Sequence, residues 1–190
     1  TKVRTDLKVM KGTHNMTKGP AMTREEAIRG IMAGVTAATE LKAEGYQILA
    51  TGEMGIGNTT TSSAVASVLM DQPVETMTGR GAGLTSEGLN RKVAAIKKAI
   101  ELNRPDPADP VDVLAKVGGL DIAGMAGVFL GGAALHMPVL MDGFISCVAA
   151  LIAMKLCPTA GDYILASHVS KEPAAHLILE HMGKEAILHA

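Results

Sequence analysis

Short apolar runs alternate with longer apolar stripes at helical spacing along the whole chain. Apolar residues three or four positions apart are typical of amphipathic helices, and short continuous apolar runs are typical of buried strands. The stripes predict helices over 24–44, Thr59–Met70, Glu87–Leu102, from Pro110 onward, Leu120–Leu135, Phe144–Leu156 and Pro173–Met182. The short runs predict strands over Ile48–Ala50, Val74–Met77, Val139–Met141 and Tyr163–Ala166, and Ile187 with Leu188 predict the start of another.

Strands that alternate with helices favour a parallel sheet, because parallel strands need a crossover connection that is usually a helix. We therefore expect an α/β fold, with a mostly parallel sheet and helices on both faces in a Rossmann-like three-layer arrangement. No shift in composition divides the chain, so we expect a single domain over 1–190. The last apolar run stops at the end of the sequence, which predicts that the chain is a fragment of something longer.

Three local patterns refine the predicted elements. Residues 23–26 (Thr-Arg-Glu-Glu) match a capping box at the start of the first helix. Asp109 followed by Pro110 is typical of a helix N-cap and first helical position. Small residues four positions apart share one face of the predicted helix 120–135, which indicates close packing against another element. They are Ala123, Gly127 and Gly131.

Composition limits the classes of function. Because 47% of the 190 residues are hydrophobic and 19% charged, the chain has enough apolar surface for a core. A net charge of −1 and the lack of Trp argue against nucleic acid binding. The apolar run Phe144–Leu156 is shorter than the roughly 20 residues of a membrane-spanning helix. Cys147 and Cys157 lie in apolar surroundings and are expected to be buried free thiols. We expect a cytoplasmic protein that binds neither nucleic acid nor membranes.

Polar residues beside glycine or another small residue follow four predicted strands. They are Glu53, the segment 79–81 (Gly-Arg-Gly), Asp142 with Gly143, and Ser167 with His168. In open parallel sheets, ligands bind outside the carboxyl ends of the strands. We therefore expect these residues to converge on one pocket.

The densest of these signals is the segment 52–61 (GEMGIGNTTT), which follows a strand and opens a helix. Free N–H groups and the helix dipole at such a position bind anions. Gly55 and Gly57 would let the backbone approach a phosphate, and Asn58 or Thr59 could add donors. Asn58 stands where a P-loop has its lysine, which argues against an ATPase and favours a single phosphate. The alternative is a glycine turn with Asn58 as an N-cap.

Charged side chains near these loops offer further chemistry. Arg80 could bind phosphate or carboxylate through its planar guanidinium. Lys92 lies between inward-facing positions of the predicted helix 87–102, so it either runs toward the site or is solvated. Glu53 is expected to be partly desolvated and a base, or else to hydrogen-bond a neighbouring loop. His176 and His181 are five positions apart and do not share a helix face, and we expect no metal and no cofactor.

The segment 52–60 resembles the signature of the nicotinate-nucleotide–dimethylbenzimidazole phosphoribosyltransferase family. Further matches to that family extend along the whole chain. They are Gly12-Thr13 with Asn15, Ala21-Met22-Thr23, Gly79-Arg80-Gly81, Gly88-Leu89 with Arg91-Lys92, Gly118-Gly119-Leu120, Met125-Ala126-Gly127, the segment 138–144 (PVLMDGF) and Ala166-Ser167-His168.

The resemblance implies transfer of phosphoribose from nicotinate mononucleotide to 5,6-dimethylbenzimidazole, which releases nicotinate and forms α-ribazole 5'-phosphate for the lower ligand of cobalamin. It implies a homodimer and a smaller helical subdomain, to which 1–45 would contribute. Carried over by motif, the phosphate-binding residues are Gly55, Gly57, Asn58, Thr59, Gly81, Lys92 and Ser170. Glu53 would line the base pocket as the catalytic residue, with Asp142 and His168 nearby.

Two parts of the family pattern are missing. The family's usual general base is a glutamate in a C-terminal Gly-Glu-Gly-Thr-Gly segment, and no such segment occurs here. The family's N-terminal portion is also absent, so we expect a core truncated at both ends. Glu53 is then the remaining candidate base. The alternative is a partial or degenerate module that binds a nucleotide or a benzimidazole without turnover.

Overall fold

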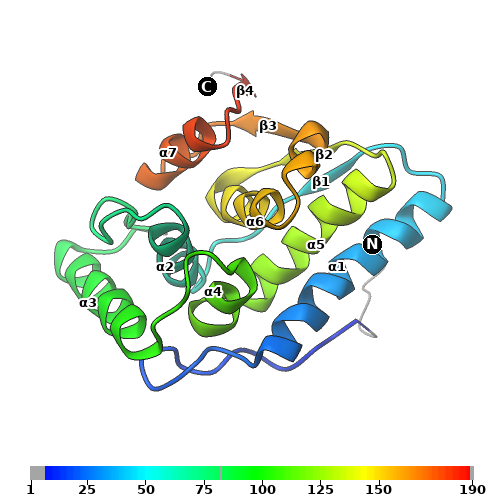
Figure 1. The fold of residues 1–190 in the computed structure, drawn as a ribbon. Coiled ribbons are helices and arrows are strands. Elements are labelled where there is room, and N and C mark those ends of the chain that lie inside the picture. Colours follow the sequence, from blue (N-terminus) through cyan, green and yellow to red (C-terminus); the bar gives the residue numbers. More distant parts are fainter. Residues whose placement is uncertain (1–6, 82, 189–190) are drawn as a thin grey trace.

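The computed structural model describes residues 7–81 and 83–188 (Figure 1). In chain order the elements are α1 (Arg24–Ala43), β1 (Leu49–Thr51), α2 (Thr59–Leu69), α3 (Ser86–Asn103), α4 (Pro110–Val117), α5 (Leu120–Ala134), β2 (Val139–Met141), α6 (Gly143–Leu156), the 3₁₀ helix η1 (Pro158–Tyr163), β3 (Ile164–His168), α7 (Pro173–His181) and β4 (Ala186–Leu188). The predicted elements agree with these bounds to within two residues, except for one predicted strand.

The four strands form one parallel sheet in the order β1-β2-β3-β4. Leu49 of β1 pairs with Val139 of β2, which pairs with Ile164 of β3, and Ala166 of β3 pairs with Ala186 of β4. The predicted α/β class, a parallel sheet surrounded by helices, is confirmed.

The two faces of the sheet differ in how the described residues cover them. Thr51, Met141 and Ala166 share one face and are buried, and α5 and α6 pack against the strands (Figure 1). On the other face, Ala50 and Leu165 are exposed. Each strand of this sheet is added at the same edge as the one before it. Because the crossover connections are right-handed, all the connecting helices then lie on the same face of the sheet. Within 7–81 and 83–188, the helices therefore cover mainly this one face of the sheet.

The strand predicted over Val74–Met77 is wrong, because this segment forms a turn. The amides of Thr76 and Met77 both donate to the carbonyl of Pro73, at 3.0 and 3.2 Å. The apolar ends of the segment are buried in the core, which explains the apolar run without a strand. The segment 79–81 therefore follows a turn and not a strand.

Helices α1 and α5 lie side by side and pack through glycines (Figure 1). A Cβ atom added at Gly127 would lie 1.8 Å from the carbonyl oxygen of Ile31, and one at Gly34 would lie 1.9 Å from that of Gly124. Any side chain at these two positions would therefore push the backbones apart. The small-residue seam predicted on 120–135 is confirmed, and its partner is α1.

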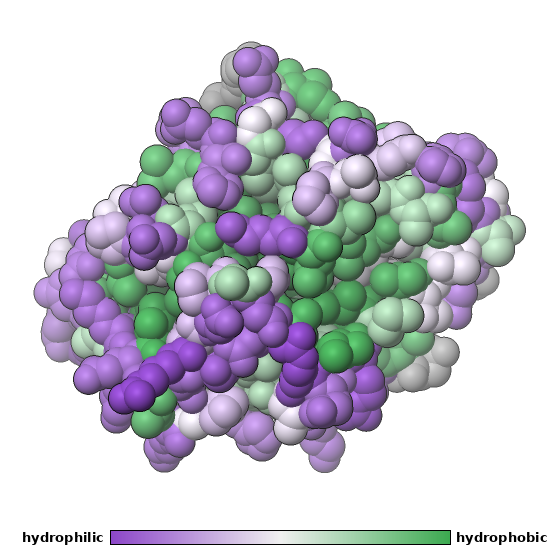
Figure 2. All heavy atoms as spheres, viewed as in Figure 1, coloured by the Kyte–Doolittle hydropathy of each residue, from purple (hydrophilic) through white to green (hydrophobic). Residues whose placement is uncertain are grey.

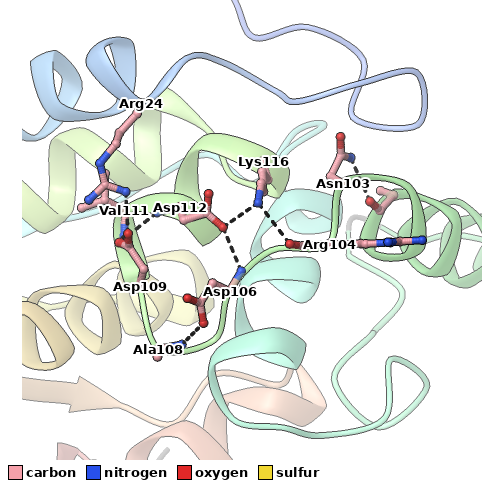
Figure 3. Close-up of polar contacts among 10 residues, drawn as sticks. Arg24, Asn103, Arg104, Asp106, Ala108, Asp109, Val111, Asp112 and Lys116 are labelled. Carbon is pink, nitrogen blue, oxygen red and sulfur yellow. Dashed lines mark hydrogen bonds and ion pairs between the residues drawn. The ribbon is translucent and has the colours of Figure 1, made fainter.

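Polar contacts hold the start of α4 to the start of α1 (Figure 3). Asp109 is the N-cap of α4 and accepts from the amides of Val111 and Asp112, at 3.0 and 3.2 Å. Its carboxylate also accepts from the Arg24 guanidinium at 2.6 Å, and this hydrogen bond lowers the pKa of Asp109. The capping box predicted at 23–26 is present as well. Both helix starts are therefore as the sequence patterns predicted.

Apolar residues gather at the centre of the face in Figure 2, where α5 and α6 lie, and hydrophilic residues cover the α3 side. Within 7–81 and 83–188, no helix combines the length and the apolar character needed to cross a membrane.

Cys147 is a buried free thiol as predicted, and burial raises its pKa to about 12. Cys157 is exposed just after α6, so the prediction that both thiols are buried is wrong.

Candidate functional site

A cavity of about 350 Å³ lies beside the segments that follow β1, β2 and β3. Its lining also includes the first residue of α2 and the glycine loop before α3. Six predicted site residues line it, namely Glu53, Gly55, Thr59, Gly81, Asp142 and Ser170. The structure therefore brings together residues that the sequence separates by more than a hundred positions.

The N-terminus of α2 carries amide groups that no helical carbonyl satisfies. The first helical bond runs from the Ser62 amide to the Asn58 carbonyl at 3.1 Å. The amides of the preceding helical residues have no partner within the helix, and the helix dipole gives this end a partial positive charge. Gly55 and Gly57 before the helix have φ angles of +77° and +86°, which favour glycine. Free amides, a partial positive charge and flexible glycines are the features that anion-binding helix starts share.

Lys92 is buried beside this turn. Its ammonium group donates to the Thr59 hydroxyl and to the Gly79 carbonyl, each at 3.0 Å. The residue is only 7% exposed, so the alternative of a solvated lysine is wrong. Burial lowers the pKa of Lys92, and the nearby negative charge of Glu172 partly opposes that shift. The buried ammonium group of Lys92 therefore contacts the hydroxyl of Thr59, the first residue of α2.

Gly81 approaches the same threonine from the glycine loop. Its φ is +56°, and a Cβ atom added there would lie 2.9 Å from the Thr59 hydroxyl oxygen. Its amide donates to a Glu172 carboxylate oxygen at 2.9 Å. The loop, the helix start and Lys92 thus form one compact group around Thr59.

Asn58 is turned toward a neighbouring cavity. Its side-chain amide nitrogen donates to an Asp121 carboxylate oxygen at 2.6 Å, and its buried Oδ1 has no partner among the described residues. Asn58 occupies the N-cap position of α2 but makes no side-chain capping bond. Gly57 lines this neighbouring cavity with Asn58. The predicted donor role of Asn58 toward phosphate would require its bond to Asp121 to change.

Arg80 lies beside the main cavity and not in its lining. Its guanidinium donates to the Leu84 carbonyl at 2.7 Å and to the Ser86 hydroxyl at 3.0 Å. It lines an adjacent cavity of about 290 Å³ that shares Gly55 and Thr59 with the main one. Arg80 therefore stiffens the glycine loop and borders the helix start from outside.

Glu53 is exposed, so the prediction that it is partly desolvated is wrong. It lies in the loop after β1, where none of the elements in the described part of the chain covers it. Its carboxylate accepts a short hydrogen bond from the Gly55 amide, which agrees with the alternative role of bonding a neighbouring loop. The carboxylate nevertheless lines the cavity and can act on a bound molecule.

Asp142 and His168 meet at the carboxyl ends of β2 and β3. Asp142 Oδ1 lies 3.2 Å from His168 Nδ1 and 3.4 Å from the Ser167 hydroxyl oxygen. Ser167 also donates to the Met141 carbonyl at 2.9 Å, which ties the end of β3 to the end of β2. Asp142 lines the cavity, whereas His168 lies behind it as a partner of Asp142.

Sequence analysis missed two kinds of residue in the lining. Met54, Phe144 and Ile145 supply an apolar wall, and Lys171 and Glu172 follow Ser170. Glu172 is the N-cap of α7 and comes directly before a proline, and this position after a strand is a signal that could have identified it.

Among the residues that the structure describes, no three His, Cys, Asp or Glu side chains are grouped to hold a metal ion.

The chain is similar in sequence to curated enzymes. A protein named nicotinate-nucleotide--dimethylbenzimidazole phosphoribosyltransferase from Acetivibrio thermocellus is 56% identical over 96% of this chain and 52% of its own length. Its namesake from Ruminiclostridium cellulolyticum is 55% identical over 95% of this chain and 51% of its own length. The chain thus spans about half the length of the curated relatives it matches.

Solved structures and a family model agree with this similarity. The crystal structure of CobT from Thermus thermophilus matches with a TM-score of 0.90 and 43% identity, over 95% of this chain and 54% of that chain. A second structure from the same organism, titled as a nicotinate-nucleotide-dimethylbenzimidazole phosphoribosyltransferase, matches with a TM-score of 0.87 and 41% identity over 95% of this chain and 53% of that chain. The model of the phosphoribosyltransferase family DBI_PRT matches residues 1–190. The chain therefore belongs to this family of phosphoribosyltransferases, as its glycine-rich motifs predicted.

Proposed function

We propose that this chain carries the phosphoribose-binding core of an enzyme that transfers phosphoribose from nicotinate mononucleotide to 5,6-dimethylbenzimidazole. The observation that carries the proposal is a cavity that is lined both by Thr59, the first residue of α2, and by two acidic residues, Glu53 and Asp142. The relatives that share this core bear the name of that transferase, which supports the proposal.

The phosphate would bind at the start of α2. Free amides of the first helical turn and the loop at Gly55 would donate to its oxygens, and Lys92 behind Thr59 would supply a positive charge. Ser170 lines the same cavity and adds a hydroxyl donor. Because a monoester phosphate is bound at several points, the ribose attached to it would be held in one orientation.

The carboxylates would act at the ribose. When the bond from C1 of the ribose to nicotinate breaks, its electron pair leaves with the nicotinate nitrogen and positive charge develops on the sugar. Glu53 and Asp142 would stabilise that charge, and the benzimidazole nitrogen would form the new bond to C1. The benzimidazole proton would pass to a carboxylate, for which Glu53 is the candidate in this chain. Met54, Phe144 and Ile145 would contact the flat aromatic base.

A turnover assay on the purified chain tests the proposal. We expect nicotinate mononucleotide and dimethylbenzimidazole to yield nicotinate and α-ribazole 5'-phosphate, separated by liquid chromatography. Lys92→Met keeps the length of the side chain and removes its charge, so it should weaken binding of nicotinate mononucleotide by at least about tenfold. Binding without product would favour a binding module over the transferase. Nicotinate mononucleotide bound away from the start of α2 in a soaked crystal would refute the proposal.

We further propose that the chain acts in the cytoplasm as a homodimer. Two unpaired thiols, Cys147 and Cys157, are consistent with a reducing compartment. On α1, Ile28 and Met32 are 43% and 51% exposed and offer apolar surface for association. Light scattering coupled to size-exclusion chromatography tests the dimer, and a monomer at micromolar concentration would refute it.

A further inference from the structure

Glu172 occupies an unusual position in the candidate site. One carboxylate oxygen accepts from the Gly81 amide at 2.9 Å. The other is buried and has no hydrogen-bond partner among the described residues. A Cβ atom added at Gly79 would lie 2.0 Å from that second oxygen, so the carboxylate packs directly on the backbone of the glycine loop. A buried carboxylate oxygen without a hydrogen-bond partner is costly unless a positive charge compensates for it.

The compensating charge is Lys92. Its ammonium group binds the carbonyl of Gly79, the same residue on which the free carboxylate oxygen packs. Glu172 is the charged group that acts on Lys92 and partly offsets the effect of burial on its pKa. The glycine loop therefore lies between the buried Lys92 ammonium group and the half-buried Glu172 carboxylate, and each contacts its backbone.

Several other charged groups near α3 already have partners of their own. Helix α2, which packs against α3, has no titratable side chain in its sequence. Several charged side chains on α3, on α4 and in the preceding loop bond to partners of their own. They are Glu87 with Arg91, Glu75 with Lys97, Asp112 with Lys116, and Arg80 with Leu84 and Ser86.

We infer that Glu172 is a positioning residue of the phosphate site, which holds the Gly81 amide and supplies the counter-charge that keeps Lys92 an ammonium ion beside Thr59. Without that carboxylate, Lys92 would still be buried but would lose its proton at lower pH, and a neutral amine binds phosphate poorly. The inference relies on the proposed function for the identity of the ligand, but not for the charge of Lys92.

Two matched variants separate this role from a purely structural one. Glu172→Gln keeps an oxygen that can accept from Gly81 and removes the negative charge. Glu180→Gln removes a charge from an exposed position on the same helix and serves as the control. Protein labelled with ¹³C at lysine Cε is titrated by NMR, with the Lys92 signal assigned by its loss in Lys92→Arg. Circular dichroism checks that each variant is folded.

We expect the Lys92 titration midpoint to fall by about one pH unit in Glu172→Gln and to stay unchanged in Glu180→Gln. Calorimetric affinity for nicotinate mononucleotide should then decline at correspondingly lower pH in Glu172→Gln. An unchanged Lys92 midpoint would overturn the inference, and so would tighter binding at every pH, since the carboxylate would then merely repel the phosphate. A shifted midpoint in a protein that does not bind nicotinate mononucleotide would refute the proposed function and uphold the role of Glu172.

Discussion

The packing of α1 on α5 allows a sharp test with two glycines of the same helix. A methyl group at Gly127 would lie 1.8 Å from the Ile31 carbonyl oxygen, whereas ordinary contacts begin near 3.4 Å. A methyl group at Gly124, one turn earlier, would meet nothing within 4 Å. Gly127→Ala and Gly124→Ala therefore make the same chemical change in the same helix with opposite steric consequences.

The expected magnitudes follow from these distances. Gly124→Ala should raise the free energy of unfolding by about 0.5–1 kcal/mol, because alanine loses less backbone entropy in a helix than glycine. Gly127→Ala gains the same amount but forces the two helices apart by roughly 1.5 Å, and no rotamer change can relieve a clash with a backbone oxygen. Since overpacking of this kind costs about 3 kcal/mol or more, we expect a net loss of about 2–3 kcal/mol.

Urea unfolding followed by far-UV circular dichroism measures both changes. The midpoint should rise slightly for Gly124→Ala and fall clearly for Gly127→Ala, with similar slopes if both variants unfold in two states. A Gly127→Ala midpoint at or above that of the wild type would show that α1 and α5 do not approach as closely as the structure has them.

Three further outcomes are expected. Asp109→Asn keeps a good N-cap but loses the ion pair, so it should cost less than about 1 kcal/mol at neutral pH. Because the folded pKa of Asp109 is lowered, this loss should vanish as the pH falls through that lowered pKa. Asp109→Ala should retain a capping loss of about 1 kcal/mol at such low pH, and a pH-independent difference between wild type and Asp109→Asn would contradict the ion pair. Iodoacetamide should modify Cys157 in the native protein and Cys147 only after unfolding, as mass spectrometry of the peptides would reveal; rapid native labelling of Cys147 would argue against its burial. Thr59→Val removes a partner of Lys92 and should weaken binding of nicotinate mononucleotide about tenfold by calorimetry, and an unchanged affinity would separate Thr59 from the site.

Much of the fold was predictable from local patterns, because the energies that set it are local. The N-cap at Asp109 depends on neighbours within three residues, and these are visible in the sequence. Short apolar runs predicted the strands Val139–Met141 and Ala186–Leu188 to within one residue. The strand prediction for Val74–Met77 failed because a buried turn and a short buried strand have the same apolar composition. Only the hydrogen bonds to the Pro73 carbonyl distinguish them.

The site was predictable as a set of segments but not as a set of contacts. Glycine positions and strand ends identified most of the lining, since these depend on backbone geometry. The partners of Asn58 and Lys92 are distant in sequence, and no local pattern indicates that Asn58 bonds to Asp121 or that Lys92 reaches Gly79. The prediction that Glu53 is partly desolvated failed for a related reason. The exposure of this side chain depends on which elements cover the loop after β1, and these are distant in sequence.

The order of strands in the sheet has a consequence for how the protein assembles. One or two short helices connect β2 to β3 and β3 to β4, whereas β1 reaches β2 only after the whole of 52–138 has been traversed. Closing that long segment costs the most chain entropy and comes late in folding. Pulse-labelled hydrogen exchange during refolding should therefore protect amides of β3 before those of β1. Because Glu53 follows β1, the cavity would then be completed in the last step.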